Sequence, residues 1–487
     1  MTRNGMNGSE LFRLSIFHTN DMHGHLEAMA RLSAFCRRLR AEAQAQGRTV
    51  FLWDAGDYAD RRVRFCSLTK GAAFSPVLNA MGYELQTMGN DISLPYGPQA
   101  MAAVAARAHF PILAANCRDG DGPLPQGLGE SVLIPLPGGL KMGVIGLTAP
   151  WDGMYEIFGL HLPDFRDVAR DWVAKLRAQG AALLIVLSHL GLSDDRRLVE
   201  AVSGIDVIIG GHSHDCLPSG EEHNGVLIAQ AGQFAEGLGR VDLALDPRTG
   251  HVIARSAQVL PVPGEEAPDP TVDEAIADAE REVEALIAQP IGTLQSGLDV
   301  DYERECGIGD LAADALREHV GADIAMVCSG MFHQGLPEGI VTLGQLDAAC
   351  FTTANPCLTV VRGSQFLSAL ERGLDPAVYR STPRGFRGTP MGIPQISGVQ
   401  VEYHPTGEPG HRVRRVVVQC EPLEGDRLYR LAHTDAETLA EVGYLQLAEG
   451  QETKIEAPII LPEVMQEYIR LHSPVAQPAG GRWLPIQ

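Results

Sequence analysis

The sequence predicts an α/β protein of two domains, and three observations lead to this prediction. The chain has 487 residues, of which 45% are apolar and 21% charged, enough for more than one hydrophobic core. From residue 11 to about 260, short β-rich runs alternate with longer amphipathic runs, as in a layered α/β domain. A proline-rich connector then precedes a second stretch with its own helix and strand patterns.

Polar residues directly follow five β-rich runs of the first domain. LFRLSIF leads into HTNDMHG, RTVFLW into DAGD, YELQTM into GND, ALLIVL into SHLG, and DVIIG into GHSH. Ligand sites in open α/β sheets lie just beyond the carboxyl ends of the strands, so we expect these five clusters to converge. EAMARLSAFCRRLRAEAQAQG and FRDVARDWVAKLRAQG are predicted helices that end at glycine.

The boundary between the domains is predicted from PVPGEEAPDPTVDEAIADAEREVEALIAQP, a connector that continues as an acidic helix closed by Pro290. We therefore expect a first domain over residues 1–262, a linker and helix over 263–290, and a second α/β domain over 291–487. In the second domain, GDLAADALREHV predicts a helix, and SGVQVEY and RVRRVVVQC predict strands.

The composition disfavours several function classes. Lys and Arg number 39 against 61 Asp and Glu, and the resulting net charge of −22 disfavours binding to nucleic acids or anionic membranes. No apolar run approaches the ~20 residues that span a bilayer, and no apolar signal core precedes the first strand, so we expect a cytoplasmic protein. The nine cysteines form no CxxC pair, which predicts buried free thiols rather than disulfides or a thiolate zinc site.

The residues at the strand ends have the donor types of a metal site. Asp-x-His, Gly-Asp, Gly-Asn, Ser-His and Gly-His-Ser-His occur in this order along the chain. Carboxylate, amide oxygen and imidazole suit divalent ions such as Mn²⁺, Zn²⁺, Fe²⁺ and Co²⁺. Each residue alone has an ordinary explanation, such as a helix cap, a turn or a buried histidine. Five such clusters at strand ends instead indicate one shared site.

These motifs resemble the metallophosphoesterases of the 5′-nucleotidase type, and the resemblance covers nearly the whole chain. It implies an N-terminal four-layer α/β/β/α metallophosphatase domain, a C-terminal α/β substrate domain and a site for two divalent metal ions. By this resemblance, Asp57 of DAGD bridges both metals, and Asp54 is a supporting or structural acid. The implied ligands of the first metal are Asp21, His23 and His214, and those of the second are Asn90, His189 and His212.

The resemblance also implies an activity, the hydrolysis of a phosphate ester, with release of phosphate from a nucleotide as the nearest family reaction. Two dications roughly 3.5–4 Å apart can generate a hydroxide at neutral pH and hold the phosphoryl oxygens during in-line displacement. The candidate catalytic residues are Asp57, Asn90, Asp91 and His189. His18 and His25 are expected to support the ligands. Two alternatives stay open: a metal- and ligand-binding regulatory protein with little catalytic activity, and hydrolysis of sulfur esters.

The sequence departs from the family directly after Asn90. The family usually continues Gly-Asn with His-Glu and with an Asp three residues after that His, whereas GNDISL places Asp91 and Leu94 there. The usual dyad is therefore absent, and substrates with a good leaving group, such as a diphosphate or an activated diester, are expected. Two nearby dications lower the pKa of Asp91, so we expect a carboxylate that repels phosphate unless a positive group pairs with it.

Three arginines follow the bridging acid in DAGDYADRRVRF. We hypothesise that at least one of Arg61, Arg62 and Arg64 binds the phosphate or neutralises Asp91, because the guanidinium fork suits phosphate and carboxylate. The alternative is a solvated basic loop.

The second domain keeps part of the family's substrate residues. CSGMFHQG stands where the family has Asn-Ser-Gly-Gly-Ile-Arg, so His333 replaces an arginine. CFTTANP keeps Phe351 and Asn355 from a Pro-Phe-Gly-Asn segment, and Arg304 lies near another family arginine position. LAHTDAETLAEVGY lacks the phenylalanine and the Gly-Gly-Asp that contact the nucleoside in the family. We therefore expect Arg61, Arg62, Arg304, His333 and Asn355 to contact a small, nucleotide-like phosphate ester.

Overall fold

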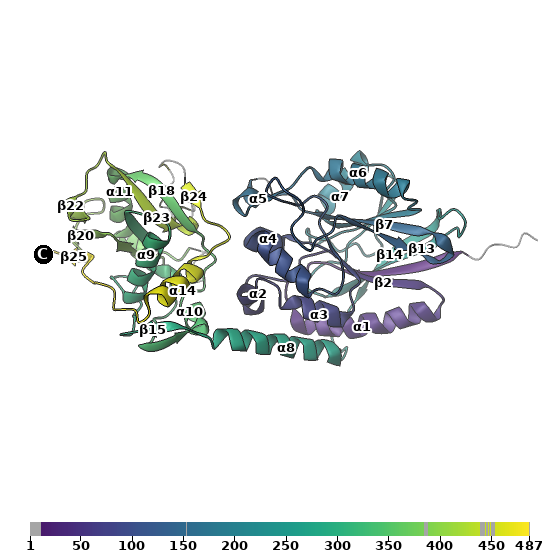
Figure 1. Cartoon of the computed structure of the whole chain (residues 1–487), viewed down its shortest axis with the longest axis horizontal. Coiled ribbons are helices and arrows are strands. Elements are labelled where there is room, and N and C mark those ends of the chain that lie inside the picture. Colours follow the sequence, from purple (N-terminus) through teal and green to yellow (C-terminus); the bar gives the residue numbers. More distant parts are fainter. Residues whose placement is uncertain are drawn as a thin grey trace, which may run out of the picture. The chain divides into compact units, whose positions relative to one another are not determined.

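The computed structural model divides the chain into two compact units, Met1–Val283 and Glu284–Gln487 (Figure 1). The structure describes residues 11–151, 153–383, 388–438, 444, 447, 449 and 453–486. The division falls inside α8 (Pro270–Ile287), within the segment predicted as linker and helix. No helix in the described ranges is long and apolar enough to cross a membrane.

The first unit contains two six-stranded sheets. The first sheet has the order β14-β13-β1-β2-β3-β4, in which β1 to β4 run parallel and β13 runs antiparallel to both of its neighbours, β1 and β14. Its strands are β1 (Phe12–Thr19), β2 (Thr49–Asp54), β3 (Leu85–Thr87), β4 (Ile112–Leu113), β13 (Gly237–Leu245) and β14 (Val252–Pro261).

The second sheet has the order β11-β12-β10-β9-β7-β6, and its four central strands are parallel. Antiparallel strands close both edges. Its strands are β6 (Ser131–Pro135), β7 (Lys141–Thr148), β9 (Leu183–His189), β10 (Val207–Ile209), β11 (Glu221–His223) and β12 (Val226–Ala229). Because each sheet contains four adjacent parallel strands, the carboxyl ends of these strands meet at one end of each sheet.

The four layers predicted for this unit are confirmed. Leu14 and Ile16 of the first sheet share one buried cluster with Val144 and Ile185 of the second, so the sheets pack face to face. Helices α6 and α7 cover the outer face of the second sheet, and α1 and α3 cover that of the first (Figure 1). The helices are α1 (Leu26–Ala45), α3 (Phe74–Met81), α6 (Phe165–Ala178) and α7 (Leu192–Ala201).

Both helices predicted from amphipathic runs are present, as α1 and α6. The Asp164 side chain caps α6 by accepting a hydrogen bond from the backbone N–H of Arg166. Gly180 follows α6 with a φ of 89°, a conformation that glycine adopts without a Cβ clash. Local sequence therefore fixes both ends of this helix.

The second unit contains a five-stranded sheet of order β19-β16-β23-β18-β24 and a four-stranded sheet of order β22-β21-β20-β25. The predicted helix is α9 (Gly307–His319), and the predicted strands are β20 (Val399–Tyr403) and β21 (Val413–Val418). The other strands are β15 (Pro290–Leu294), β16 (Ile324–Cys328), β17 (Gly339–Thr342), β18 (Pro356–Arg362), β19 (Pro394–Ser397), β22 (Glu421–Pro422), β23 (Leu428–Thr434), β24 (Thr453–Ile455) and β25 (Trp483–Pro485). Further helices include α10 (Leu343–Ala349), α11 (Gly363–Gly373), α12 (Pro376–Tyr379) and α14 (Leu461–His472).

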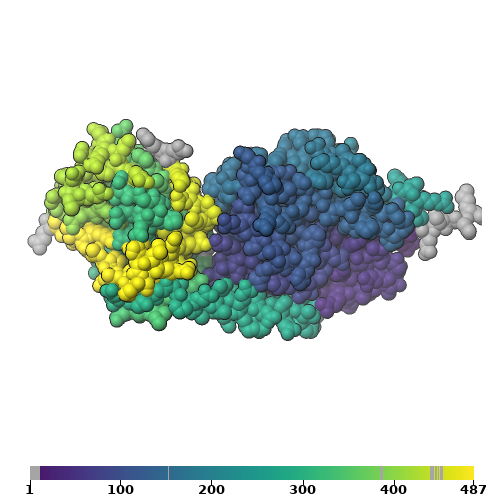
Figure 2. Space-filling model, in the orientation of Figure 1, coloured from purple at the N-terminus to yellow at the C-terminus, as the bar shows by residue number. Residues whose placement is uncertain are grey.

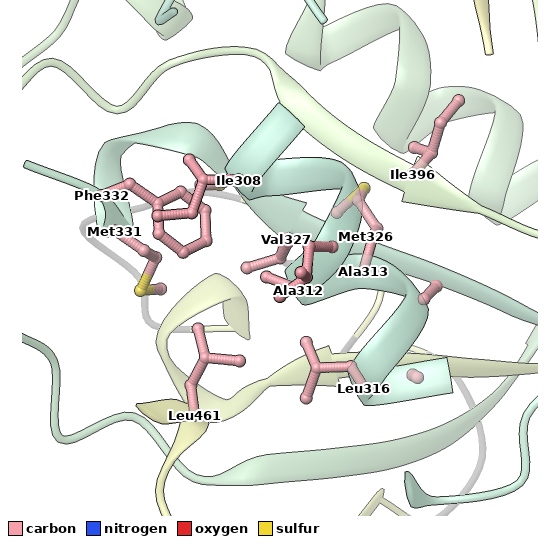
Figure 3. Packing of buried hydrophobic residues seen from close by; sticks show 14 of the residues in the cluster. Ile308, Ala312, Ala313, Leu316, Met326, Val327, Met331, Phe332, Ile396 and Leu461 are labelled. Atoms are coloured by element: carbon pink, nitrogen blue, oxygen red, sulfur yellow. The ribbon is translucent and has the colours of Figure 1, made fainter. Parts of the chain in front are cut away.

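The core of the second unit forms where α9 packs on β16. Figure 3 shows Ala312 and Leu316 of α9 beside Val327 of β16 and Leu461 of α14, and all four are fully buried. In the space-filling view, side chains fill the spaces between the ribbons of each unit (Figure 2). The nine cysteines are free, as predicted, and only Cys216 and Cys420 are exposed.

Candidate metal centre

The five predicted polar clusters all lie at carboxyl ends of parallel strands. Asp21 follows β1, Asp57 follows β2, Asn90 follows β3, His189 ends β9 and His212 follows β10. The chain continues the pairing of β1 and β2 into the loops, because the N–H of Asp21 donates to the Gly56 carbonyl (2.9 Å) and that of His23 to the Asp57 carbonyl (3.0 Å). The first two motifs are thereby held side by side.

Five of the seven predicted ligands have a left-handed backbone. The φ values are 51° at Asp21, 47° at His23, 54° at Asp57, 74° at His212 and 59° at His214. This conformation disfavours a residue with a Cβ by roughly 1–2 kcal/mol, so surrounding contacts must hold it. Strained backbone of this kind clusters at functional sites, so these five positions together are a candidate site.

The first donor cluster consists of Asp21, His23 and His214. The Nε2 atoms of the two histidines are 2.9 Å apart, and the Asp21 Oδ1 lies 3.5 Å from that of His214. This Oδ1 is buried and accepts no hydrogen bond from the described residues, whereas Oδ2 accepts from the His212 N–H. Three lone-pair atoms that converge in this way fit a divalent cation between them.

The second donor cluster contains Asp57, His189 and His212, with Asn90 beside it. The His189 Nδ1 donates to the Ala55 carbonyl (2.7 Å), which leaves Nε2 as the nitrogen for a metal. This Nε2 lies 3.2 Å from the Asp57 Oδ2 and 3.2 Å from the Asn90 Oδ1. Carboxylate, amide and imidazole donors therefore meet at one point, which again fits a cation.

The electrostatics of the site favour positive charge. Burial alone lowers the pKa of His189, but the nearby Asp57 carboxylate outweighs this effect and raises that pKa above its usual value. For Asp57 the effects are reversed. Burial raises its pKa, but the nearby His189 lowers it more, so the pKa of Asp57 lies below its usual value. A divalent cation bound by these residues would replace the proton on His189.

Two motif glycines are required by close approach to the candidate ligands. A Cβ on Gly89 of GND would lie 2.0 Å from the Asp57 Oδ1, and one on Gly56 of DAGD would lie 2.6 Å from the His189 Nδ1. Asp54 stands behind them as the structural acid that the sequence predicts. It accepts hydrogen bonds from the Gln86 side chain (2.8 Å) and the Gly56 N–H (3.1 Å).

Asp91 lies in the first turn of α4 (Asn90–Arg107), a helix that kinks at Gly97. Its Oδ2 is 2.8 Å from the His23 Nδ1, and its N–H donates to the Asp57 Oδ1 (2.9 Å). The positive group that pairs with Asp91 is therefore an imidazole. Burial lowers the pKa of His23, but Asp91 and the other carboxylates raise it to about 9.

The predicted arginines lie on the surface of the first unit. Arg62 pairs with Asp60, with Nε 2.9 Å from Oδ2, and its side chain is 74% exposed. Arg61 is exposed, and Arg64 begins α2 (Arg64–Thr69). The structure thus pairs Arg62 with Asp60 rather than with Asp91, and phosphate binding by these arginines stays a prediction.

The predicted substrate residues of the second unit differ in exposure. Arg304 pairs with Asp301 (2.8 Å), and its side chain is 81% exposed. His333 is also exposed. Asn355 is buried, and its amide donates to the Ile459 carbonyl (2.7 Å), so this amide is engaged within the unit. Phe332 belongs to the hydrophobic core (Figure 3).

Sequence reasoning missed three residues beside the donor clusters. Asn20 donates to the Asp21 Oδ2 (2.7 Å), and its place in HTND could have indicated this role. Phe234 donates its N–H to the Asp21 carbonyl (2.8 Å), and its ring lies 5.8 Å from that of His23. Trp151 is 44% exposed, and its ring lies 6.2 Å from that of His212. Nothing in the sequence around Phe234 or Trp151 indicates these contacts.

The two histidines predicted to support the ligands have different surroundings. His25 stacks on Phe234, with ring centroids 4.4 Å apart, and Phe234 in turn contacts His23. His18 lies within β1, so close to β13 that a Cβ on Gly239 would come within 2.2 Å of its ring. Burial lowers the pKa of His18 to about 3, as expected for a neutral packing residue.

Comparisons with known proteins agree with this geometry. Residues 14–216 match the model of calcineurin-like phosphoesterases, and residues 289–448 match the C-terminal domain of 5′-nucleotidases. The chain is 28% identical over 432 residues to the metallophosphoesterase YunD of Bacillus subtilis, covering 88% of this chain and 93% of that protein. It is 26% identical over 536 residues to a snake venom 5′-nucleotidase of Crotalus adamanteus, covering 97% and 89%.

A solved structure shows the same fold along the whole chain. The NAD nucleotidase of Haemophilus influenzae superposes with a TM-score of 0.61 at 16% identity, covering 98% of this chain and 100% of that one. The two matched family models together span both units in the order that the resemblance predicts. The chain is thus a metal-dependent phosphoric ester hydrolase that belongs to the two-domain metallophosphoesterases of the 5′-nucleotidase type.

Proposed function

We propose that this protein hydrolyses a small, nucleotide-like phosphate ester at a centre of two divalent metal ions in its first unit. The observation that supports this most directly is the position of Asp57. One of its carboxylate oxygens belongs to a donor group with His189 and His212, and it also groups with His23 of the other cluster. A carboxylate placed between two donor clusters is suited to bridge two cations.

The other ligands divide between the two ions in this proposal. Asp21, His23 and His214 bind one ion, and Asn90, His189 and His212 bind the other, with Mn²⁺, Zn²⁺, Fe²⁺ or Co²⁺ as suitable metals. Two such ions lower the pKa of bound water and neutralise charge on the phosphoryl oxygens. The left-handed backbone of five candidate ligands aims their side chains at the ions. Hydrogen bonds such as that from His189 to the Ala55 carbonyl hold the imidazole rings in place.

The substrate is expected to have a good leaving group. The residue that donates a proton in the family is replaced by Asp91, whose carboxylate accepts a hydrogen bond from His23. Exposed Arg61, Arg62, Arg304 and His333 remain candidates for contacts to phosphate or to the rest of the substrate. Asn355 is a weaker candidate because its amide already donates to the Ile459 carbonyl. We also propose the cytoplasmic location that the sequence predicts.

Turnover by metal-loaded protein tests this function. The protein is stripped of metal, reloaded with each of the four ions, and assayed on aryl phosphate mono- and diesters and then on nucleotides. We expect hydrolysis with at least one ion, its loss in His189→Gln, and its retention in His223→Gln. His223 is a matched control because it lies in the same unit and contacts Glu200 instead of the donor clusters.

Ligand binding without turnover is the outcome that would contradict the proposal. If nucleotides bind and no ester is hydrolysed with any of the four ions, the protein is a binding or regulatory member of the family.

A further inference from the structure

We propose that Asp91 is a positioning residue, whose carboxylate fixes the imidazole ring of His23 for metal binding in the Asp21–His23–His214 cluster. This role would replace the proton transfer that the family assigns to this position. The inference rests on the metal centre of the proposed function and deepens it, because it says what retains one of the two ions.

The hydrogen bond between Asp91 and His23 determines which nitrogen of His23 can bind a metal. An ionised carboxylate only accepts, so the Nδ1 of His23 donates to the Asp91 Oδ2 over 2.8 Å. Once the ring loses its second proton, Nε2 is then the nitrogen with a free lone pair. It lies 2.9 Å from the His214 Nε2 and 3.8 Å from the Asp21 Oδ1, within the first donor cluster.

The backbone of Asp91 is held by a hydrogen bond, as its side chain is. Its N–H donates to the Asp57 Oδ1 (2.9 Å) at the start of α4, and the N–H of His23 donates to the Asp57 carbonyl (3.0 Å). One residue therefore connects the predicted bridging acid to a ligand of the first cluster. A change at Asp91 is expected to move the His23 ring more than the rest of the site.

The two clusters use different acceptors to orient their histidines. The Nδ1 of His189 donates to a backbone carbonyl, that of Ala55, which no side-chain substitution removes. The Nδ1 of His23 depends on the side chain of Asp91. A carboxylate partner also makes an imidazole a stronger metal donor, and loss of such partners typically weakens metal binding 10–100-fold. We therefore expect a substitution at position 91 to weaken metal binding in the first cluster more than in the second.

This assignment also explains how the site tolerates a carboxylate where the family has histidine. Asp91 accepts a hydrogen bond from the N–H at His23 Nδ1, so its carboxylate is paired inside the protein instead of facing the phosphate. The same contact leaves no proton on Asp91 for a leaving group. Rates are then expected to depend steeply on the pKa of the leaving group.

Metal titration separates this role from a general structural one. Metal-free wild type, Asp91→Ala and Asp91→Asn are titrated with Co²⁺, and visible absorption and calorimetry resolve the two binding events. We expect one of the two sites to weaken 10–100-fold in Asp91→Ala while the other changes less than about threefold. Asp91→Asn should recover part of this loss, because its amide oxygen can accept from His23.

A charge-matched control is Glu84→Gln, which removes one carboxylate of the same unit that pairs with Arg40. It should leave both affinities unchanged. The proposal is overturned if Asp91→Ala keeps both affinities, or if both sites weaken equally in a variant whose thermal midpoint without metal is normal. It is also overturned if wild type binds three ions and Asp91→Ala two, since Asp91 would then be a ligand, as its grouping with His23 and Asp57 permits.

The proposal can still be tested if the Asp91→Ala variant does not fold or if the protein hydrolyses no ester. If Asp91→Ala does not fold, the ¹⁵N shifts of His23 in metal-loaded wild type decide, because the proposal requires a protonated Nδ1 hydrogen-bonded to a carboxylate. Absence of ester hydrolysis would contradict the proposed function and leave the affinity measurements valid, so the two failures are distinguishable.

Discussion

The two units of this protein present their predicted functional residues in opposite ways. In the first unit the candidate ligands are held by strained backbone, by close glycines and by hydrogen bonds between motifs far apart in sequence. In the second unit, Arg304 and His333 are exposed, and Asn355 is engaged by a carbonyl of its own unit. The fold therefore holds the candidate metal ligands in place, whereas it constrains the candidate substrate residues Arg304 and His333 much less.

The largest expected effect contrasts one residue from each unit. Asp57→Asn removes the charge placed between the donor clusters, so kcat/KM should fall at least about 100-fold and the number of bound ions per chain should drop. Arg304→Ala removes an exposed side chain and should change kcat/KM by at most about tenfold, mainly through KM. Steady-state kinetics and metal analysis check both. Equal losses in the two variants would remove the contrast between the units.

In the second unit, His433 is expected to make the folded protein sensitive to acid. Burial lowers the pKa of this histidine to about 4, although a hydrogen bond to Thr434 acts in the opposite direction. The unfolded chain binds a proton near pH 6.5 and the folded chain does not, so stability is lost as the pH falls from about 6.5 to 4. The loss at pH 4 amounts to about 3 kcal/mol.

Urea unfolding of wild type and His433→Asn across this pH range measures the difference. A variant with the same pH slope as wild type would show that His433 is not the group that titrates.

Close packing at the metal centre predicts the next effect. Gly89→Ala places a Cβ 2.0 Å from the Asp57 Oδ1 and should destabilise the metal-free protein by about 1–3 kcal/mol. Gly264→Ala is the control, because a Cβ there meets no atom within 4 Å. Denaturant unfolding compares the two. Equal stabilities would mean that the loops of DAGD and GND adjust freely, contrary to a rigid centre.

The smallest expected effect is optical. Trp151 is exposed and its ring lies 6.2 Å from that of His212, so metal binding at His212 should alter its emission. Zn²⁺ titration of wild type should change the tryptophan fluorescence, and Trp151→Phe should lose most of that change. An identical change in the variant would assign the signal to another tryptophan.

The sequence predicted a layered α/β domain and the convergence of five polar clusters because both follow from patterns along the chain. Alternating strands and helices predict α1 and α6, and the strand-end rule brings Asp21 and Asp57 together. The partner of Asp91 could not be predicted in this way, because it depends on which way the His23 ring turns. The role of Phe234 could not be predicted either, since its contact is with a residue far away in the sequence, the Asp21 carbonyl.

The carboxylates around His23 have a practical consequence for calorimetry. At neutral pH the metal-free protein holds a second proton on His23, whose pKa is raised to about 9, and an ion that binds at Nε2 must expel that proton while Nδ1 keeps its own. The heat measured on loading then includes the ionisation enthalpy of whichever buffer takes up that proton. Titrations repeated in two buffers of different ionisation enthalpy would count the protons released per ion.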